Sequence, residues 1–158
     1  DRETALRACR MVKEAGFSLV GQMMIGLPGD TLEKAIYSAK ETVKIAPSIA
    51  RLYPTVVIEE TELFDMASDG RYTPLSLNES VSRTKAMYKI LDEAGINIIR
   101  VGLKSSDIIN DDGDITKGTF HPAMRQLVEG EIAREILETY FNLKTVTDVT
   151  DVEGTLLK

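Results

Sequence analysis

Residues 16–31 read GFSLVGQMMIGLPGDT, and this stretch decides the fold. Gly16 follows an amphipathic pattern and ends it as a C-terminal helix cap does. The segment 17–27 is almost continuously apolar, which predicts a strand buried on both faces, as in a parallel sheet. Asp30 and Glu33 resemble a capping box, so a helix is expected directly after Asp30 with this residue as its N-cap.

The same alternation continues outward from this stretch. Helices are expected over 1–15, 31–46, 61–68, 76–94 and from 122 onward, and strands over 17–27, 51–58 and 96–103. Ser76 and Glu79 form a Ser-x-x-Glu capping box at the start of the fourth helix. Strands joined by helices are expected to be parallel, with ligands at their carboxyl ends. The sequence therefore predicts an α/β fold, and residues 142–158 are compatible with an edge strand.

Composition limits the kind of protein this is. The chain has 158 residues with 43% hydrophobic and 28% charged side chains, which is typical of one soluble globular domain. A net charge of −6 disfavours nucleic-acid binding through a general basic surface. One cysteine and one histidine exclude an internal disulfide and a thiolate metal site within this chain. No apolar run is long enough to span a bilayer, so no membrane partner is expected, and the single cysteine favours a cytoplasmic location.

The loop after the first strand, Gly26 to Asp30, has three possible roles. A loop between strand and helix can place N–H groups around a phosphate. Here Pro28 has no N–H, and Asp30 puts a carboxylate where the anion would lie, so phosphate binding is disfavoured. A tight turn without a ligand, or support for a flat uncharged ring with Met24 as a polarisable contact, both remain open.

Two further features each allow a structural and a functional interpretation. Pro54 interrupts a predicted strand, which indicates either an edge strand or a bulge that re-aims side chains near a site. His121 precedes a predicted helix, where it is either a capping residue or a base or substrate contact. Met23 and Met24 should face opposite sides of their strand, with core filling as the simplest role. The acidic segment 110–114 does not fit an EF-hand loop and is expected to be a solvated turn.

The order of several short motifs resembles a known family. The segments 14–17, 22–31, 51–58, 61–63, 70–72, 99–103 and 121–127 are similar to the C-terminal half of radical S-adenosylmethionine enzymes. The most similar branches are the catalytic subunit of Elongator and the oxygen-independent coproporphyrinogen oxidases. The resemblance implies half of a (β/α)6 partial barrel with parallel strands over residues 1–70. A C-terminal α/β extension would follow over residues 71–158.

This resemblance also implies cofactors and site residues. The full-length protein would bind S-adenosylmethionine and a [4Fe–4S] cluster, the latter through a Cys-x-x-x-Cys-x-x-Cys loop that this chain lacks. The common family pattern has Gly and Ile where this chain has Gln22 and Met24. By similarity, the cofactor-binding residues would be Gln22, Met24, Gly26, Tyr53, Pro54 and Thr55, and the substrate residues would be Arg100, His121 and Arg125.

The resulting expectation is a C-terminal fragment of a radical enzyme, beginning at Asp1 as an excised piece, that lines the cofactor and substrate pocket. Its partners would be the N-terminal half of the same protein and a tRNA base or a porphyrinogen-like substrate. The isolated fragment is expected to be inactive, to hold no cofactor, and to form a homo-oligomer. A non-catalytic α/β interaction module that oligomerises through its sheet edge, and a flavodoxin-like small-molecule binder, are the alternatives.

Overall fold

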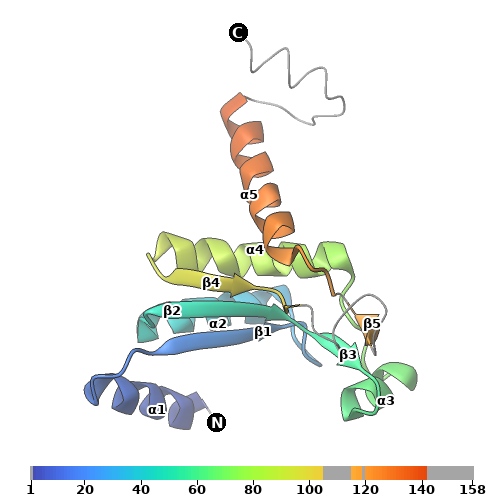
Figure 1. Cartoon of the computed structure of the whole chain (residues 1–158), viewed down its shortest axis with the longest axis horizontal. Coiled ribbons are helices and arrows are strands. Elements are labelled where there is room, and N and C mark those ends of the chain that lie inside the picture. Colours follow the sequence, from blue (N-terminus) through green and yellow to red (C-terminus); the bar gives the residue numbers. More distant parts are fainter. Residues whose placement is uncertain (1, 105–114, 119, 142–158) are drawn as a thin grey trace.

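A computed structural model describes residues 2–104, 115–118 and 120–141 (Figure 1). The elements run in the order α1 (Arg2–Glu14), β1 (Val20–Ile25), α2 (Leu32–Ile45), β2 (Ile49–Pro54), β3 (Val56–Ile58), α3 (Glu62–Ser68), α4 (Leu77–Glu93), β4 (Asn97–Val101), β5 (Ile115–Gly118) and α5 (Met124–Phe141). The turn predicted at 110–114 and the edge strand considered for 142–158 lie outside the described residues.

The predicted helix boundaries follow local capping signals. Helix α1 ends before Gly16, whose N–H donates to the Lys13 carbonyl as in a Schellman cap. Helix α4 begins with the predicted capping box, because Ser76 accepts from the Glu79 N–H and the Glu79 carboxylate accepts from the Ser76 N–H. These ends are therefore set by residues adjacent in the sequence.

The start of α2 differs from the prediction by one residue. The N-cap is Thr31, whose hydroxyl oxygen accepts from the Lys34 N–H, so the assignment of Asp30 as the cap was wrong. The carboxylate of Asp30 instead accepts from the Gly26 N–H at 2.8 Å. Asp30 thus stabilises the loop before the helix and leaves the helix end to its neighbour.

Strands β1, β2 and β4 form one parallel sheet in the order β1-β2-β4, which confirms the predicted α/β fold with parallel strands (Figure 1). Helices α2 and α4 cover one face of this sheet. The core between them is made of Met23, Ile25, Ala35, Ala39, Ala50, Leu52, Val81, Met87, Leu91 and Ile98. Strand β4 follows residue 70 and yet belongs to the same sheet, and the domain boundary proposed at that residue stays a prediction.

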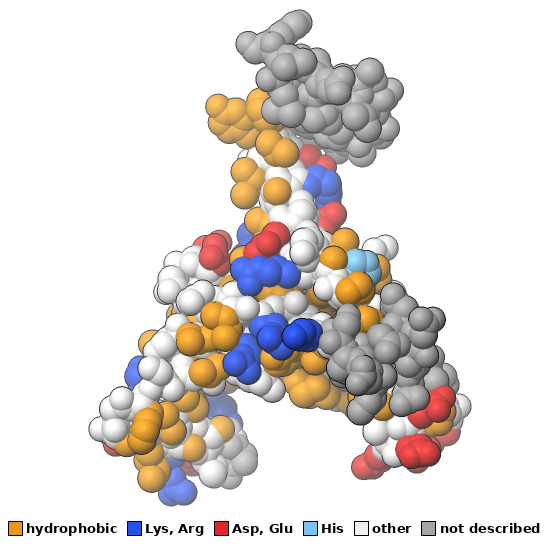
Figure 2. Space-filling view, in the orientation of Figure 1, with side chains coloured by type: hydrophobic (Ala, Val, Ile, Leu, Met, Phe, Trp, Pro, Cys, Tyr) orange, Lys and Arg blue, Asp and Glu red, His pale blue; other side chains and the backbone are white. Residues whose placement is uncertain are grey.

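The opposite face of the sheet has no described helix over it. In β1 the side chains of Val20, Gln22 and Met24 are exposed, while Met23 and Ile25, which point to the other face, are buried. Burial of this strand on both faces was therefore a wrong prediction for the described chain, because only one face has helices packed on it. Figure 2 shows hydrophobic and basic side chains together on the face turned to the reader. We call this face the open face.

The segment predicted as one strand over 51–58 forms two strands in two sheets. Strand β2 ends at Pro54, and β3 pairs antiparallel with β5 in a separate two-stranded sheet. Strand β2 is the central strand, and its register irregularity lies between Ala50 and Arg51. Both interpretations of Pro54, an edge strand or a bulge at that residue, were therefore wrong. Pro54 is the last residue of β2, and the next N–H, that of Thr55, donates to the Ile25 carbonyl of β1 at 2.8 Å.

Helix α5 packs on α4 and β4 through its first turns and then stands out from the body (Figure 1). Met124 and Val128 are buried, whereas Ile136 and Tyr140 are exposed. The predicted helical repeat is thus correct as a helix, but only its first half contributes to the core. No described helix is both long and apolar enough to cross a membrane.

Candidate functional site

Side chains on the open face form rows that run across the strands. Gln22 of β1 is paired with Arg51 of β2, and Arg51 is paired with Arg100 of β4. One step nearer the carboxyl ends of the strands, Met24 is paired with Tyr53. We call Gln22, Arg51 and Arg100 the donor row, and we call Met24 and Tyr53 the ring row. Four of the predicted site residues therefore lie side by side, and Arg51 lies between them.

A bulge in β4 places Arg100 in the donor row. Ala50 is paired with Ile98, but the next residue, Arg51, is paired with Arg100, so Ile99 is an extra residue in β4. In a regular strand without the bulge, alternation from Ile98 would put Ile99 on the open face and turn Arg100 toward the helices. The bulge thus brings two guanidinium groups onto the same face of adjacent strands.

The two arginines of the donor row have no acceptor among the side chains that the structure describes. Among the described residues, neither Arg51 nor Arg100 forms an ion pair or a side-chain hydrogen bond, and the Arg51 Nε is shielded from solvent without a partner. Like charges facing each other across strands repel, and a shielded donor without an acceptor costs free energy. Figure 2 shows Lys and Arg side chains gathered over the strands of this face. The donor row therefore fits an anionic group between its members.

The ring row has a different chemistry. Met24 is 51% exposed and Tyr53 is half-buried. A polarisable thioether beside an aromatic ring favours contact with a flat ligand ring. Since the ring row lies at the carboxyl ends of parallel strands, it occupies the edge where such sheets bind ligands.

The other three predicted cofactor residues lie at the same edge but are buried. Thr55 is 5% exposed, and its hydroxyl has no hydrogen-bond partner among the described residues. Pro54 is buried too. Gly26 is buried, its N–H donates to Asp30, and its carbonyl accepts from the Tyr72 hydroxyl. These residues shape the edge of the sheet, and the polar backbone atoms of Gly26 already have partners within the chain.

The predicted substrate residues do not converge on one point. His121 accepts the Ala123 N–H on Nδ1 at 3.1 Å, which is a local capping contact, and it lines a narrow crevice beside Pro54. Arg125 donates to the Ile98 carbonyl and to Glu129, each at 2.8 Å. It therefore ties α5 to β4, while Arg100 lies on the open face.

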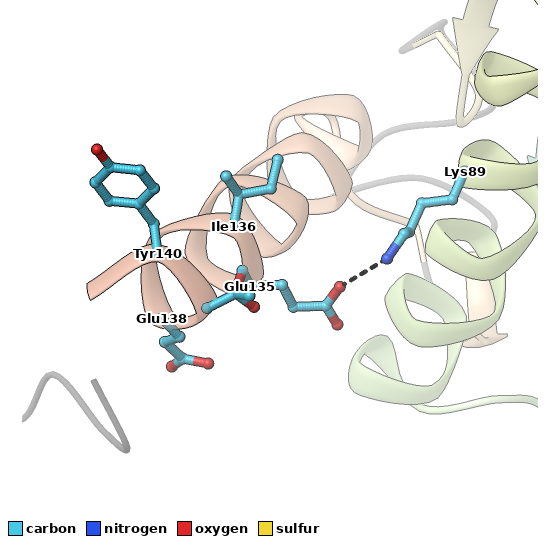
Figure 3. Close-up of a pocket in the computed structure, with 6 residues that line it drawn as sticks. Lys89, Glu135, Ile136, Glu138 and Tyr140 are labelled. Carbon is cyan, nitrogen blue, oxygen red and sulfur yellow. Dashed lines mark hydrogen bonds and ion pairs between the residues drawn. The ribbon is translucent and has the colours of Figure 1, made fainter. Parts of the chain in front are cut away.

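A hollow of about 490 Å³ between α4 and α5 is a weaker candidate for a site. It is lined by Lys89, Glu135, Ile136, Glu138, Thr139 and Tyr140. Figure 3 shows Lys89 paired with Glu135, at 3.3 Å, while Tyr140 points away from this pair. None of the predicted site residues lines this hollow, and its basic residue, Lys89, is already paired with Glu135.

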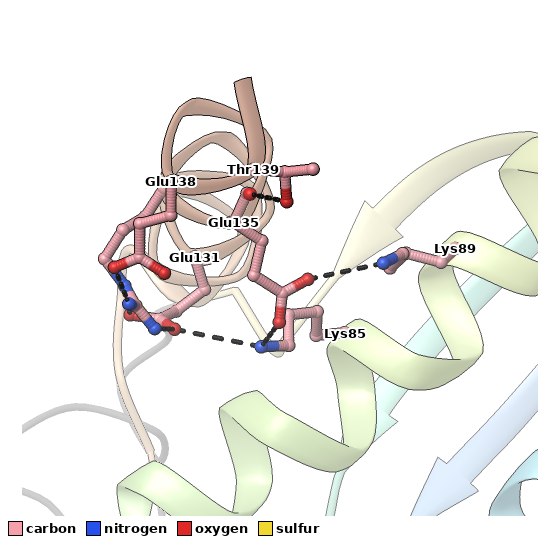
Figure 4. A network of polar contacts seen from close by, with 7 residues as sticks. Lys85, Lys89, Glu131, Glu135, Glu138 and Thr139 are labelled. Carbon is pink, nitrogen blue, oxygen red and sulfur yellow. Dashed lines mark hydrogen bonds and ion pairs between the residues drawn. The ribbon is translucent and has the colours of Figure 1, made fainter. Parts of the chain in front are cut away.

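The polar contacts between α4 and α5 explain how these helices are held together. Lys85 pairs with Glu131 at 3.8 Å and also with Glu135, which Lys89 contacts as well (Figure 4). The hydrogen bond from Lys85 lowers the pKa of Glu135. The charges of these lysines and glutamates are paired with one another, which is typical of a network that stabilises helix packing.

The described residues contain no group of three or more His, Cys, Asp or Glu side chains that could hold a metal ion. The sequence has a single cysteine, Cys9, which is partly buried in α1. Since iron–sulfur clusters are held by several thiolates, this cysteine cannot hold a cluster alone. The residues present on the open face fit an organic ligand better than a metal.

Two residues of this region were missed by the sequence analysis. Arg51 stands two positions before Tyr53 in a predicted strand, and that spacing places both on one face, so a signal was available. Tyr72 contacts Gly26 across 46 positions of sequence, and no local pattern indicates this contact.

Comparisons with known proteins place the chain in a family. Residues 47–134, more than half of the chain, match the family described as the Radical_SAM C-terminal domain. The chain is 30% identical over 82 residues to a tRNA uridine(34) acetyltransferase of Methanocaldococcus jannaschii, which covers 50% of this chain and 15% of that protein. It is 36% identical over 83 residues to human Elongator complex protein 3, which covers 49% of this chain and 15% of that protein.

A solved structure shows the same fold. The archaeal Methanocaldococcus infernus Elp3 with an N-terminal deletion matches with a TM-score of 0.69 at 22% identity, covering 92% of this chain and 36% of that one. The aligned part of the chain spans only about 15% of the length of the curated relatives named above. The resemblance to the Elongator-like C-terminal region is confirmed, and this chain belongs to the family of radical SAM C-terminal domains.

Proposed function

We propose that this chain is the C-terminal part of a radical S-adenosylmethionine enzyme that modifies a tRNA uridine, and that its open face lines the pocket for cofactor and substrate. The observation that carries this proposal is the parallel pairing of β1 with β2, which puts Met24 beside Tyr53 and Gln22 beside Arg51 on a face that no described helix covers. Membership of the family supports the cofactor. The names of the matched relatives support the tRNA substrate.

The two rows suit different parts of such ligands. Met24 and Tyr53 would contact a flat base, and both side chains tolerate either the adenine of the cofactor or a uracil. Arg51 and Arg100 would bind an anionic group, since guanidinium groups match the geometry of phosphate and carboxylate. The chain carries a net charge of −6, so the two arginines are a local exception to its acidic character. A local cationic site fits a substrate that carries phosphate.

The N-terminal half of the protein and this chain would have different roles toward the cofactors. In the whole enzyme, the iron–sulfur cluster and S-adenosylmethionine supply radical chemistry that abstracts hydrogen from a substrate. The residues of this chain would bind and orient the rings and exclude water from the pocket. Cys9 alone cannot ligate the cluster, so its ligands would come from the N-terminal half of the protein. That half would also cover the open face, where Val20 and Met24 are now exposed.

The proposal is tested by removing the charges of the donor row from the full-length protein. Arg51→Gln and Arg100→Gln should each weaken tRNA binding by about tenfold. Each should also reduce the slope of log K against log salt concentration by about 1, the value expected for the loss of one phosphate contact. The matched control is Arg10→Gln, which removes an exposed guanidinium from α1. Filter binding at several salt concentrations measures all three variants. Equal effects of the control and the two test variants would refute the assignment.

A second experiment separates tRNA from the porphyrinogen alternative. After anaerobic reconstitution, we expect 5′-deoxyadenosine to be released in the presence of tRNA and not of coproporphyrinogen. Met24→Ala and Tyr53→Ala should weaken S-adenosylmethionine binding, because each removes one side of the ring row. Release that depends on coproporphyrinogen alone would replace the proposed substrate while keeping the cofactor.

A further inference from the structure

The peptide groups of Gly26 are held from both sides by side chains of this chain. The Gly26 N–H donates to Asp30 Oδ2 at 2.8 Å, and the Tyr72 hydroxyl donates to the Gly26 carbonyl at 2.6 Å. Gly26 directly follows the last residue of β1 and has φ of +85°. These two bonds therefore fix the direction in which the chain leaves the sheet, two residues after Met24.

Residues far along the sequence complete this arrangement. Arg83 of α4 donates from Nη1 to the Asp30 carbonyl at 3.1 Å, and the same nitrogen lies 3.8 Å from Asp30 Oδ2. Tyr72 is itself placed by its own N–H, which donates to the Met66 carbonyl at 3.0 Å. The segment between α3 and α4 thus contacts the end of β1 from 46 positions further along the chain.

Leu75 closes the remaining side of Gly26. A Cβ added at Gly26 would lie 2.6 Å from Leu75 Cδ1 and 2.9 Å from Leu75 Cγ, so only a glycine fits there without movement. By contrast, residues 27–29 beyond it are exposed. Tyr72, Leu75, Asp30 and Arg83, which we call the Gly26 clamp, are the groups that hold this loop on the body of the protein.

The Tyr72 hydroxyl remains a donor over the whole physiological range of pH. The side chain is 8% exposed, and this burial raises the pKa of its hydroxyl. Its bond to a carbonyl in a region shielded from water is stronger than the same bond at the surface. Losing it would leave the Gly26 carbonyl buried without this partner.

We propose that Tyr72 is a positioning residue, which through the Gly26 clamp holds the end of β1, and with it Met24 of the ring row, at the place where a ligand ring binds. This role rests on the proposed function, because it assumes that the open face binds a nucleoside. It gives the segment after α3 a task in the ligand pocket, although Tyr72 lies on the covered side of the loop and does not touch the ligand.

The test compares Tyr72→Phe with Tyr88→Phe in the full-length protein. Both substitutions remove one partly shielded hydroxyl that has a partner, and Tyr88 donates to Glu129 at 2.9 Å between α4 and α5, away from β1. Hydrogen exchange of a peptide covering residues 24–31 is measured without ligand. Affinity is measured with S-adenosylhomocysteine, an unreactive analogue. Tyr72→Phe should speed exchange of the peptide and weaken binding, each by about tenfold, and Tyr88→Phe should change neither more than twofold.

The outcomes separate the two proposals. If the wild-type protein does not bind the analogue, the proposed function fails, and with it the ligand-positioning role. If the wild type binds and Tyr72→Phe binds equally well, the positioning role is overturned and the proposed function stands. Unchanged exchange in Tyr72→Phe, or equal weakening by Tyr88→Phe, would also overturn the role, because the effect would then be absent or general.

Discussion

Substituting Gly26 by alanine is the most direct test of the geometry at the end of β1. The new methyl group would meet two costs. A non-glycine residue at φ of +85° costs about 1–2 kcal/mol, and the clash with Leu75 Cδ1 at 2.6 Å adds about 1–3 kcal/mol for overpacking. Reduced freedom of the unfolded chain returns about 0.4–1 kcal/mol. We therefore expect Gly26→Ala to lower the free energy of unfolding by about 1–5 kcal/mol.

Gly29 provides a matched control in the same loop. It has φ of +74°, but a Cβ added there meets no atom within 4 Å. Gly29→Ala thus carries the conformational cost without the clash, and it should destabilise by about 1 kcal/mol. The difference between the two variants isolates the contact with Leu75. Urea unfolding followed by circular dichroism gives both values.

The double variant Gly26→Ala with Leu75→Ala tests the cause. If the clash is the reason, the two substitutions should couple by at least about 1 kcal/mol, because the shorter side chain makes room for the new methyl group. Equal destabilisation by Gly26→Ala and Gly29→Ala, or additivity in the double variant, would refute the reasoning.

Three further predictions concern other parts of the chain. Ala46→Gly should raise the free energy of unfolding by about 1 kcal/mol, because Ala46 caps α2 at φ of 51°, and an unchanged urea midpoint would contradict this. Since Lys85 lowers the pKa of Glu135 below 4.5, their attraction is present above that pH and is lost as the pH falls through the lowered pKa. Amides of α5 should therefore exchange faster at pH 3 than at pH 6 relative to those of α4, and the same acid effect in Lys85→Met would exclude this pair as the cause. The isolated chain should self-associate through its exposed apolar residues, and a monomer in light scattering at crystallisation concentrations would contradict this expectation.

The sequence alone predicted those features that depend on neighbouring residues. The alternation of strands and helices, the end of α1 at Gly16 and the capping box at Ser76 all use signals within four positions. The parallel sheet followed from this order, because strands joined by helices pair in parallel. Recognition of the family came from the order of several motifs rather than from any one of them.

Contacts between distant segments could not be predicted in this way. Ile99 is an extra residue only in comparison with β2, where no residue is paired with it. The sequence of β4 therefore does not reveal that Arg100 shares a face with Arg51. The split of segment 51–58 depends on β5, which lies more than 50 positions further along the chain. Tyr72 reaches Gly26 from a loop whose own sequence has no periodicity.

The bond from Arg125 to the Ile98 carbonyl has a consequence for how sheets from two copies could join. Strand β4 is one outer strand of the main sheet, and this bond from α5 takes up one of its carbonyls, whereas β1 has no described strand on its outer side. Within the part of the chain that the structure describes, β1 is therefore the outer strand left for another strand to join. If β1 of one copy pairs with β1 of a second copy about a twofold axis, both of these outer strands are used in the same contact. Assembly through β1 therefore stops at a dimer and does not extend into a fibre.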